Sequence, residues 1–261
     1  MNHIIELRNI TFHYPQCDRN ILANCSMSVD RGDLISILGP NGAGKSTLLN
    51  CCCGLLRPQC GEVLVENNKI QNLEQKEIAK NIGYVQQMQK SSFAHTVFDY
   101  VLMGRASNVG LFHKPNAQDY KIAEEAMEMM NLAHLADSPI TEISGGERQQ
   151  AAIARAVAQQ PKVILFDEPT SHLDYGNQIK TLRLISNLQK QGFAIVMTTH
   201  NPDHCMMLGG RVAILDRKGF LENGFVNEVL TEDRLREVYN TNLHLEYVEA
   251  VGRMICIPDG L

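Results

Sequence analysis

The segment GPNGAGKST, residues 39–47, constrains the fold of this chain more than any other stretch. It follows the apolar run at residues 34–38 and precedes STLLNCCCGLL, so a buried strand leads through glycines directly into a helix. The loop fits the pattern G-x-x-x-x-G-K-[ST], whose glycines let backbone N–H groups surround an anion at a helix N-terminus. The sequence therefore predicts a phosphate-binding unit made of a strand, a loop and a helix.

Each residue type in this loop has an expected task. The backbone N–H groups of residues 42–46 surround the β-phosphate of a nucleotide, and Lys45 places its charge between the β- and γ-phosphates. The Ser46 hydroxyl is positioned to bind a magnesium ion. A chance match is the alternative, which the flanking strand and helix argue against. The predicted nucleotide-binding residues of the loop are Gly39, Pro40, Asn41, Gly42, Ala43, Gly44, Lys45, Ser46 and Thr47.

Two carboxylates follow a second apolar run, in VILFDEPT. Burying a charge without a partner costs several kcal/mol, so Asp167 and Glu168 are expected to emerge at an edge of the sheet. There Asp167 can meet the magnesium ion through water, while Glu168 points elsewhere and acts as the general base that polarises the attacking water. A plain polar cap at the end of a strand is the alternative interpretation.

Composition excludes several classes of function. The formal net charge of −5 gives no general attraction to nucleic acid or to anionic membranes, and the sequence has no local basic patch, so we expect no nucleic-acid partner. The 44% hydrophobic content supports a globular core. The N-terminus lacks the pattern of a targeting signal, and no apolar run approaches the about 18 residues of a membrane span. A cytosolic chain that does not cross a bilayer is therefore expected.

The cysteines are not arranged like a metal site. No C-x-x-C pair occurs, and Cys51, Cys52 and Cys53 are consecutive, so they cannot all face one ion on a helix. We expect reduced, partly buried structural thiols, with a metal or redox site as the alternative. The eight cysteines are Cys17, Cys25, Cys51, Cys52, Cys53, Cys60, Cys205 and Cys256.

Periodicity predicts mainly strands before residue 90. HIIELRNITFHY, SMSVDRGDLISILG with a turn at residues 31–33, GEVLVENNKI and NIGYVQQ are expected strands, and a polar helix covers residues 73–80. VILFDEP and AIVMTTH are two further apolar strands, separated by a helix at residues 179–190. Strands that alternate with helices imply a parallel sheet.

The segment at about residues 90–155 has a different, helical character and is predicted to be inserted into this sheet. A helix is expected at residues 118–133, with Asn116 as its N-cap. Its apolar stripe is predicted at Ile122, Ala126, Met129 and Ala133.

ISGGERQQAAIARA places a serine and two glycines at the start of an alanine-rich helix. Glycine is a poor helix former, so bare backbone is needed at this turn. Gly145 and Gly146 expose N–H groups at a helix N-terminus, which makes a second anion site. Ser144 and Glu147 also match a capping box, and both interpretations can hold because capping leaves the glycine N–H groups free.

GPNGAGKST, ISGGERQ, VILFDEPTSHLD and AIVMTTH, in this order and spacing, resemble the ATPase subunit of an ATP-binding cassette (ABC) transporter. The resemblance extends to about residue 230. It implies an α/β P-loop NTPase with a mixed sheet core, an N-terminal antiparallel β subdomain and an inserted α-helical subdomain. The implied single domain spans 1–261, with a core at about 1–90 and 156–230, a helical subdomain at about 91–155 and a C-terminal tail at 231–261.

In this family two ATPase subunits pair head to tail, so the resemblance implies that two ATP molecules and their Mg²⁺ ions lie between two copies. Ser144, Gly145, Gly146 and Glu147 would then bind the ATP held by the partner's glycine loop. Asp174, in SHLD, corresponds to the loop that crosses the interface, with His172 where alanine is more frequent.

Three more positions carry over from the family. Tyr14 matches the aromatic residue that stacks on adenine, with Phe12 as the alternative. Gln87 matches the glutamine that touches magnesium and the attacking water; Gln86, where proline is usual, is a weaker alternative. His200 matches the histidine that contacts the γ-phosphate and orients Glu168.

The resemblance also implies partners and a location. The chain is most similar to the ATPases of importers for iron-siderophore, haem or cobalamin complexes, which bind an integral membrane permease at the cytoplasmic face of the membrane and depend indirectly on a substrate-binding protein. Residues after Gln87, to about Gly104, would form the groove for the permease's coupling helix. The alternatives are a molybdate or tungstate importer, a soluble ABC ATPase without a transport role, and a regulatory module that does not hydrolyse ATP; Glu168 and His200 argue against the last.

Overall fold

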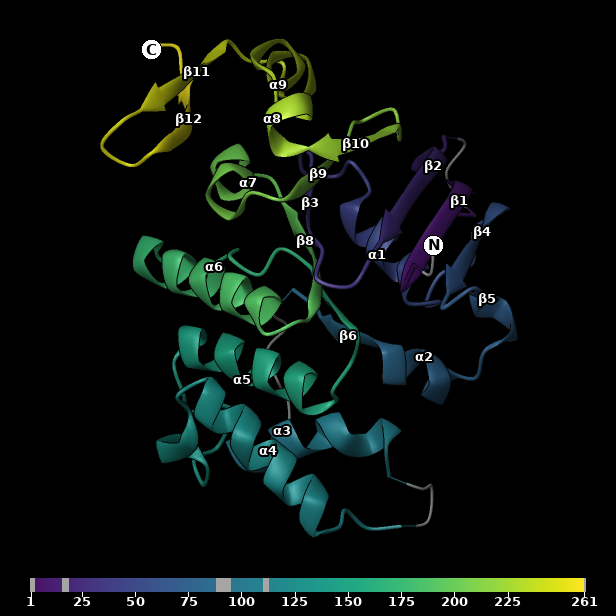
Figure 1. Ribbon diagram of the computed structural model, residues 1–261, viewed down its shortest axis with the longest axis vertical. Helices are drawn as coiled ribbons and strands as arrows, with labels where there is room; N and C mark the ends of the chain where they lie inside the picture. The colour runs from purple at the N-terminus through teal and green to yellow at the C-terminus, as the bar shows by residue number, and fades with distance from the viewer. Residues whose placement is uncertain (1–2, 16–18, 88–94, 110–112, 261) are drawn as a thin grey trace.

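The computed structural model describes residues 3–15, 19–87, 95–109 and 113–260. Within them, six strands form a sheet in the order β10-β9-β3-β8-β7-β6, in which all neighbours are parallel except β10 and β9 (Figure 1). Its parallel strands read as continuous apolar runs because both faces are covered. The strands are β3 (Leu34–Leu38), β6 (Ile82–Val85), β7 (Val163–Phe166), β8 (Ala194–Thr199), β9 (Arg211–Leu215) and β10 (Leu221–Phe225).

Alternate residues of these strands face different hydrophobic cores. On β7, Val163 and Leu165 pack in one core, while Ile164 and Phe166 pack in the other, and all four are fully buried. Successive side chains of a strand point to opposite faces, so one short apolar strand supplies both cores. The predicted parallel sheet is confirmed, with β10 as an added antiparallel edge strand.

An antiparallel sheet of four described strands, in the order β2-β1-β4-β5, lies beside the central sheet (Figure 1). Its buried residues share a core with helix α1 and one face of the central sheet. The predicted mixed sheet with an N-terminal antiparallel part is thus confirmed. These elements are β1 (Ile5–Phe12), β2 (Leu22–Val29), β4 (Cys60–Val65), β5 (Asn68–Lys69), α1 (Lys45–Cys52), η1 (Ile70–Asn72) and α2 (Gln75–Asn81).

Helices α3 to α5 gather at one end of the molecule and pack against one another (Figure 1). Their buried side chains join those of α6 and one face of the central sheet in a second core. The expected helical insertion is therefore present. Its elements are α3 (Val97–Leu102), η2 (Met103–Ser107), α4 (Ala117–Met129), η3 (Ala133–Leu135) and α5 (Gly145–Ala158).

The predicted buried stripe of α4 is partly wrong. Asn116 caps the helix as expected, accepting hydrogen bonds from the backbone N–H groups of Gln118 (2.8 Å) and Asp119 (3.2 Å). Met129, however, is 44% exposed, because at 100° per residue it lies on the margin of the face that Ala126 shares with Met130. Ala133 is exposed and belongs to η3. The apolar buried positions are Ile122, Ala123, Ala126, Met127 and Met130.

Helix α6 (Tyr175–Lys190) begins four residues before the predicted start at residue 179. The Asp174 side chain caps it, accepting hydrogen bonds from the backbone N–H of Asn177 at 2.9 Å and from its side-chain amide at 2.7 Å. An aspartate at the N-cap satisfies a backbone donor that the first turn leaves free. The periodicity of apolar residues does not indicate this start, because the first turn of the helix is polar.

The C-terminal part packs against one face of the central sheet, at β3 and β9. Helices α7, α8 and α9 form a third core with β9, and the hairpin of β11 and β12 lies at the opposite end of the molecule from α3 to α5 (Figure 1). The elements are α7 (Pro202–Leu208), α8 (Val226–Val229), α9 (Glu232–Tyr239), β11 (Leu243–Val248) and β12 (Arg253–Pro258).

Seven cysteines lie in the described part of the chain, and all are free thiols. Burial raises the pKa of Cys51 and of Cys53 to about 12. The described residues contain no cluster of His, Cys, Asp and Glu side chains that could hold a metal. They also contain no helix long and apolar enough to span a membrane. Cys17 lies outside the described residues.

Candidate nucleotide site

The carboxyl ends of four parallel strands meet at one edge of the central sheet. Leu38 at the end of β3 pairs with Thr199 of β8, and Phe166 at the end of β7 pairs with both Met197 and Val85. The residues that directly follow these strands therefore emerge together. They are the glycine loop after β3, Gln86 and Gln87 after β6, Asp167 and Glu168 after β7, and His200 after β8.

Two glycines of the loop are required by space and backbone conformation. A Cβ on Gly39 would lie 2.3 Å from the carbonyl oxygen of Leu215, so any side chain there would collide with β9. Gly44, the N-cap of α1, has a φ of 107° and lies against Ile21. Only glycine adopts such a φ without a steric penalty. The loop thus turns tightly from β3 into α1, which presents the N-terminus of the helix to the cavity.

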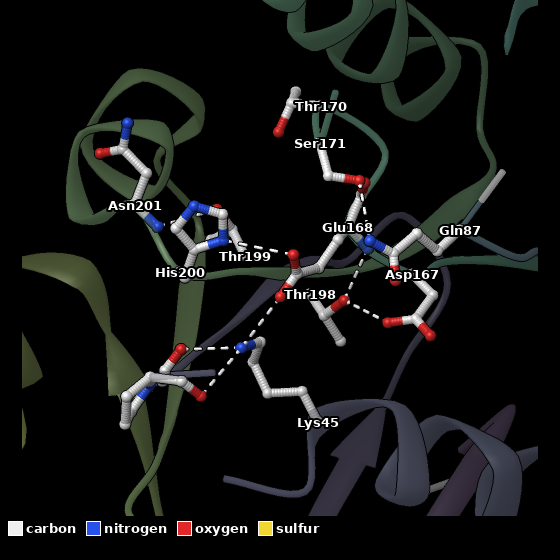
Figure 2. Close-up of polar contacts among 12 residues, drawn as sticks. Lys45, Gln87, Asp167, Glu168, Thr170, Ser171, Thr198, Thr199, His200 and Asn201 are labelled. Carbon is white, nitrogen blue, oxygen red and sulfur yellow. Dashed lines mark hydrogen bonds and ion pairs between the residues drawn. The ribbon is translucent and has the colours of Figure 1, made fainter. Parts of the chain in front are cut away.

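The Lys45 side chain lies inside this loop and is 4% exposed. Its Nζ donates hydrogen bonds to the carbonyl oxygens of Gly39 (2.8 Å) and Pro40 (3.2 Å), and lies 3.0 Å from Oε1 of Glu168 (Figure 2). A buried ammonium group must be paired, and here the paired carboxylate belongs to the residue predicted as general base. The glycine loop and the acidic strand end are therefore joined by a direct charge contact.

Glu168 is held from two sides. Its Oε2 lies 3.2 Å from Nδ1 of His200, and its Oε1 contacts Nζ of Lys45. The carboxylate thus lies between the Lys45 ammonium group and the His200 ring (Figure 2). The backbone of Glu168 has a φ of 45°, in the left-handed region that few non-glycine residues adopt. This turn directs the Glu168 carboxylate away from that of Asp167, its neighbour in the chain.

Thr198 fixes both acidic residues and was missed by the sequence analysis. This residue of β8 is fully buried. Its hydroxyl donates to Oδ1 of Asp167 at 2.8 Å and accepts the backbone N–H of Glu168 at 2.8 Å (Figure 2). Two adjacent threonines, Thr198 and Thr199, at the end of an apolar buried strand were the available signal, because a buried hydroxyl needs partners. Tyr84 completes the surroundings of Asp167, with its hydroxyl 3.4 Å from Oδ2.

A cavity of about 440 Å³ opens in front of these groups. Gln87 lines it and donates a hydrogen bond from its side-chain amide to Oγ of Ser171 at 3.2 Å; Gln86 is exposed and does not line it. The lining residues are Tyr14, Ile21, Asn41, Gly42, Gly44, Lys45, Ser46, Thr47, Gln87 and Glu168.

The two aromatic candidates near this cavity have different environments. Phe12 is 4% exposed and belongs to the core, whereas Tyr14 is 41% exposed and lines the cavity. The Tyr14 hydroxyl lies 3.2 Å from Oγ1 of Thr47, and its ring packs edge-on against Phe12 at 5.0 Å. This placement favours Tyr14 as the surface on which a base stacks, with Phe12 as its support.

The turn of Ser144 to Glu147 is a capping box and lies apart from this cavity. Ser144 Oγ accepts the Glu147 backbone N–H at 3.3 Å, and Glu147 Oε2 accepts the Ser144 backbone N–H at 2.8 Å. The same contacts lower the pKa of the Glu147 carboxyl. A Cβ added to Gly145 would meet nothing within 4 Å, so this backbone is open. None of these four residues lines the cavity that holds Lys45.

Asp174, expected to bond across an interface, caps α6 within its own chain. Its hydrogen bonds to the backbone N–H and side chain of Asn177 lower the pKa of the Asp174 carboxyl. Asp174 and the neighbouring Tyr175 are exposed, the latter to 79%. A surface of this kind is available to a partner, although the described contacts of Asp174 are local.

The strand, glycine loop and helix, with a buried lysine and two acids at the end of a neighbouring strand, define a P-loop ATPase. Residues 22–171 match the model of the family described as ABC transporter, and the chain belongs to this family. It is therefore an ATP-hydrolysing ABC subunit, as predicted.

Two relatives and two solved structures illustrate the likeness. The chain is 36% identical to the molybdate import ATP-binding protein MolC of Haemophilus influenzae, over 92% of this chain and 89% of the relative. It is 36% identical to a probable iron chelatin transport ATP-binding protein of Helicobacter pylori, over 92% and 94%.

An inward-facing metal-chelate type ABC transporter matches with a TM-score of 0.87 and 33% identity, over 100% of this chain and 98% of that chain. A dimeric bacterial ABC transporter cassette matches with a TM-score of 0.73 and 31% identity, over 85% and 98%. Both likenesses extend well beyond the glycine loop, which supports comparison of the whole fold.

Proposed function

We propose that two copies of this chain bind two ATP molecules between them, head to tail, and that hydrolysis powers import of a metal chelate through a membrane permease. The observation that carries the proposal is the contact of Glu168 with both Lys45 and His200, at 3.0 Å and 3.2 Å, beside a cavity that the turn of residues 144–147, here called the signature turn, does not line. One copy thus supplies the phosphate-binding lysine and the base. The second anion site must then come from another copy.

The contacts of Glu168 define its role in hydrolysis. A triphosphate in the loop attracts Lys45, since phosphate oxygens are its preferred partners, and this exchange releases the Glu168 carboxylate toward the attacking water. Glu168 then accepts a proton from that water as general base. His200, which already lies against Glu168, orients the carboxylate and contacts the γ-phosphate. Both members of this pair belong to one copy of the chain.

The surroundings of Asp167 fit a magnesium ion. Asp167 is 6% exposed, and its side-chain hydrogen-bond partners in the described residues are the uncharged hydroxyls of Thr198 and Tyr84. A nearly buried carboxylate with neutral partners favours a cation beside it. Ser46 and Gln87 line the nucleotide cavity, and Asp167 directly precedes its lining residue Glu168, so these three residues form the proposed ligand set. The ion, when bound, neutralises phosphate charge.

The head-to-tail pairing rests on the geometry of the signature turn. Ser144 caps α5, which leaves the open backbone of Gly145 free to bind an anion from another molecule, whereas a Cβ on Gly146 would lie 3.3 Å from the Asn177 side chain. Asp174 and Tyr175, exposed after the acidic strand, are proposed to face the same partner. The dimeric cassette of similar fold supports this pairing.

A groove between α2 and the segment α3–η2 is the proposed docking site of the permease. This groove, of about 850 Å³, is lined by apolar and polar residues that include His95, Asp99, Leu102 and Met103. These four fall within the predicted segment between Gln87 and Gly104, of which residues 88–94 lie outside the described chain. Binding there would hold the subunit at the cytoplasmic face of the membrane. A substrate-binding protein would contact the permease and not this chain.

The cargo is inferred from the relatives. The iron chelatin relative and the metal-chelate type transporter favour an iron-siderophore, haem or cobalamin complex. Molybdate is the second candidate, because the MolC relative of Haemophilus influenzae covers as much of the chain at the same identity.

Glu168→Gln tests the ATPase mechanism. The change removes a proton acceptor and keeps the shape of the side chain, so we expect ATP binding to persist while turnover falls by about 10²–10⁴-fold. Size-exclusion chromatography with light scattering should then show an ATP-dependent dimer. Glu124→Gln, on the exposed face of α4, is the matched control and should behave like the wild type. Near-normal hydrolysis in Glu168→Gln would assign the base to another residue.

Transport requires a separate test with a permease. The chain, co-expressed with a candidate permease and reconstituted in vesicles, should drive ATP-dependent uptake of a ferric siderophore, and the Glu168→Gln complex should not. Uptake of molybdate in its place would select the second candidate. If no polytopic membrane protein co-purifies and ATP hydrolysis is independent of one, the transport role is wrong and a non-transport ATPase remains.

A further inference from the structure

We propose that the C-terminal tail positions His200, with Tyr239 as the positioning residue. Tyr239 is the last residue of α9, and its hydroxyl donates a hydrogen bond of 2.8 Å to the backbone carbonyl oxygen of His200. The two residues are 39 positions apart in the chain. This inference rests on the proposed catalytic role of His200 and adds a tail residue that neither the glycine loop nor the signature turn contains.

The ring of Tyr239 is fixed by packing. It lies against the third core, which includes Cys205 of α7 and Leu235 of α9, and is joined there by Leu245 and Cys256 of the hairpin. Burial raises the pKa of the Tyr239 hydroxyl, and the charge of Glu168 contributes to the shift, so the hydroxyl remains a donor near the catalytic carboxylate. A fixed ring with a protonated hydroxyl can hold a carbonyl in one place.

The hairpin of β11 and β12 also contacts the segment that follows His200. Oδ1 of Asp203, the second residue of α7, accepts a hydrogen bond from the backbone N–H of Cys256 at 3.1 Å and lies 3.5 Å from Nη1 of Arg253. Asn201 caps α7 by accepting the backbone N–H of Asp203 at 2.9 Å. The chain from His200 to Asp203 is thus held between the end of β8 and the tail.

This support matters because the His200 side chain is itself half-exposed. Its side chain is 50% exposed, and its described hydrogen bond is the one to Glu168 at 3.2 Å. A residue with so little packing depends on its backbone for direction. The Tyr239 hydroxyl fixes that backbone at the carbonyl of the same residue, so its loss should loosen the contact of His200 with Glu168.

Tyr239→Phe removes the hydroxyl and retains the ring, and the full-length protein is used. We expect kcat for ATP to fall about threefold to tenfold, the scale of one lost hydrogen bond, while KM for ATP stays within about twofold. The melting temperature should fall by no more than about 2–4 °C. Tyr247→Phe is the matched control, since Tyr247 lies in the same tail and is 62% exposed; it should match the wild type.

A spectroscopic measurement without nucleotide makes the test independent of hydrolysis. In protein labelled with isotopic histidine, the His200 signal is the one that disappears in His200→Gln. Tyr239→Phe should move this signal and leave that of His134, at the helical end, unchanged. Tyr247→Phe should move neither.

An unmoved His200 signal, or an unchanged kcat, in Tyr239→Phe would overturn the positioning role. A large fall in melting temperature with equal loss of all histidine signals would also overturn it, because the hydroxyl would then act on folding alone. If the wild type hydrolyses no ATP, the proposed function fails, whereas the His200 signal still decides whether Tyr239 orients this residue.

Discussion

At the scale of single residues, Thr198 links the two acids that the proposed mechanism separates by role. One hydroxyl group binds the Asp167 carboxylate and the Glu168 backbone, both at 2.8 Å. The proposed metal ligand and the proposed general base are therefore held in one fixed relation by a residue that does not line the nucleotide cavity. Such a hydroxyl positions the two acids through hydrogen bonds, and its neighbours contact the reacting atoms.

Thr198→Val tests this link. Valine keeps the β-branched shape but leaves the Asp167 carboxylate and the Glu168 N–H without this partner, so we expect kcat to fall about tenfold or more and the magnesium requirement to rise. Steady-state hydrolysis across a magnesium titration measures both. Thr198→Ser, which retains the hydroxyl, should recover most of the activity.

Thr181→Val is the matched control, since Thr181 is a buried threonine of α6 that bonds to the Asn177 carbonyl, away from the site. It should leave kcat and the magnesium dependence unchanged. Equal effects of the two valine substitutions would show that Thr198 contributes only to stability.

The sequence patterns predicted the residues on the loops but missed their supports. Lys45, Glu168 and His200 belong to local patterns with a chemical reason for each residue type. Thr198 and Tyr239 act through partners 31 and 39 positions away, so no local spacing reveals them. Burial also separates Phe12 from Tyr14, and that quantity depends on the tertiary fold. The proposed roles of the loop residues await the experiments above.

At the scale of elements, helix α1 carries the glycine loop on one end and the cysteine run on the other. Cys51 and Cys52 are buried in the core, and Cys53 is the C-cap of the helix. Burial raises the pKa of Cys52 strongly and that of Cys51 and Cys53 to about 12. These thiols therefore anchor the helix as small apolar side chains.

Thiol labelling tests this interpretation. A raised pKa keeps a thiol protonated below that pKa, so at pH 8 Cys51 to Cys53 should resist iodoacetamide in the native protein and react after denaturation. Exposed Cys60 should react in both states. Peptide mass spectrometry measures each position. Rapid native labelling of the run, or its protection by Zn²⁺, would support the metal or redox alternative.

Element types were predictable, whereas their ends and faces were less so. The apolar runs before the glycine loop and before Asp167 identified buried strands because those strands are apolar on both faces. The start of α6 depends on the Asp174 cap, and the buried face of α4 includes Met127 in place of Met129. The first turn of α6 is polar, and Met129 lies at the margin of the apolar face of α4. At such positions the periodicity of apolar residues says little about where a helix starts or which face is buried.

At the scale of the whole molecule, the functional surfaces lie on different elements. The nucleotide cavity is at the carboxyl edge of the central sheet, the signature turn starts α5, and the proposed permease groove lies between α2 and η2. The tail lies at the opposite end from the helical insertion (Figure 1). The division into a core, a helical subdomain and a tail stays a prediction. Closure of two copies would bring the nucleotide cavity of one copy against the signature turn of the other, although the cavity and the turn lie apart within a single chain.

Ser144→Arg tests whether the turn serves a partner. A large cation at the mouth of α5 should block closure of the proposed dimer, and hydrolysis should fall by at least about 10²-fold. Affinity of the monomer for ATP, measured by equilibrium dialysis, should change by less than about twofold, because Ser144 does not line the Lys45 cavity. Loss of monomer binding would instead place the turn in the site of its own chain.

Mixed dimers test the head-to-tail arrangement. Two substitutions, Lys45→Ala and Ser144→Arg, are placed either in different copies or in the same copy. All copies carry Glu168→Gln so that bound ATP is retained, and two tags allow purification of mixed pairs. With Lys45→Ala in one copy and Ser144→Arg in the other, a head-to-tail dimer confines both defects to one site and retains ATP in the second. With both changes in one copy, each site contains one defect, so neither site should close and retain ATP through gel filtration, although the intact Lys45 loop still binds ATP reversibly. The reverse pattern would mean that a single copy completes each site, and the head-to-tail arrangement would be wrong.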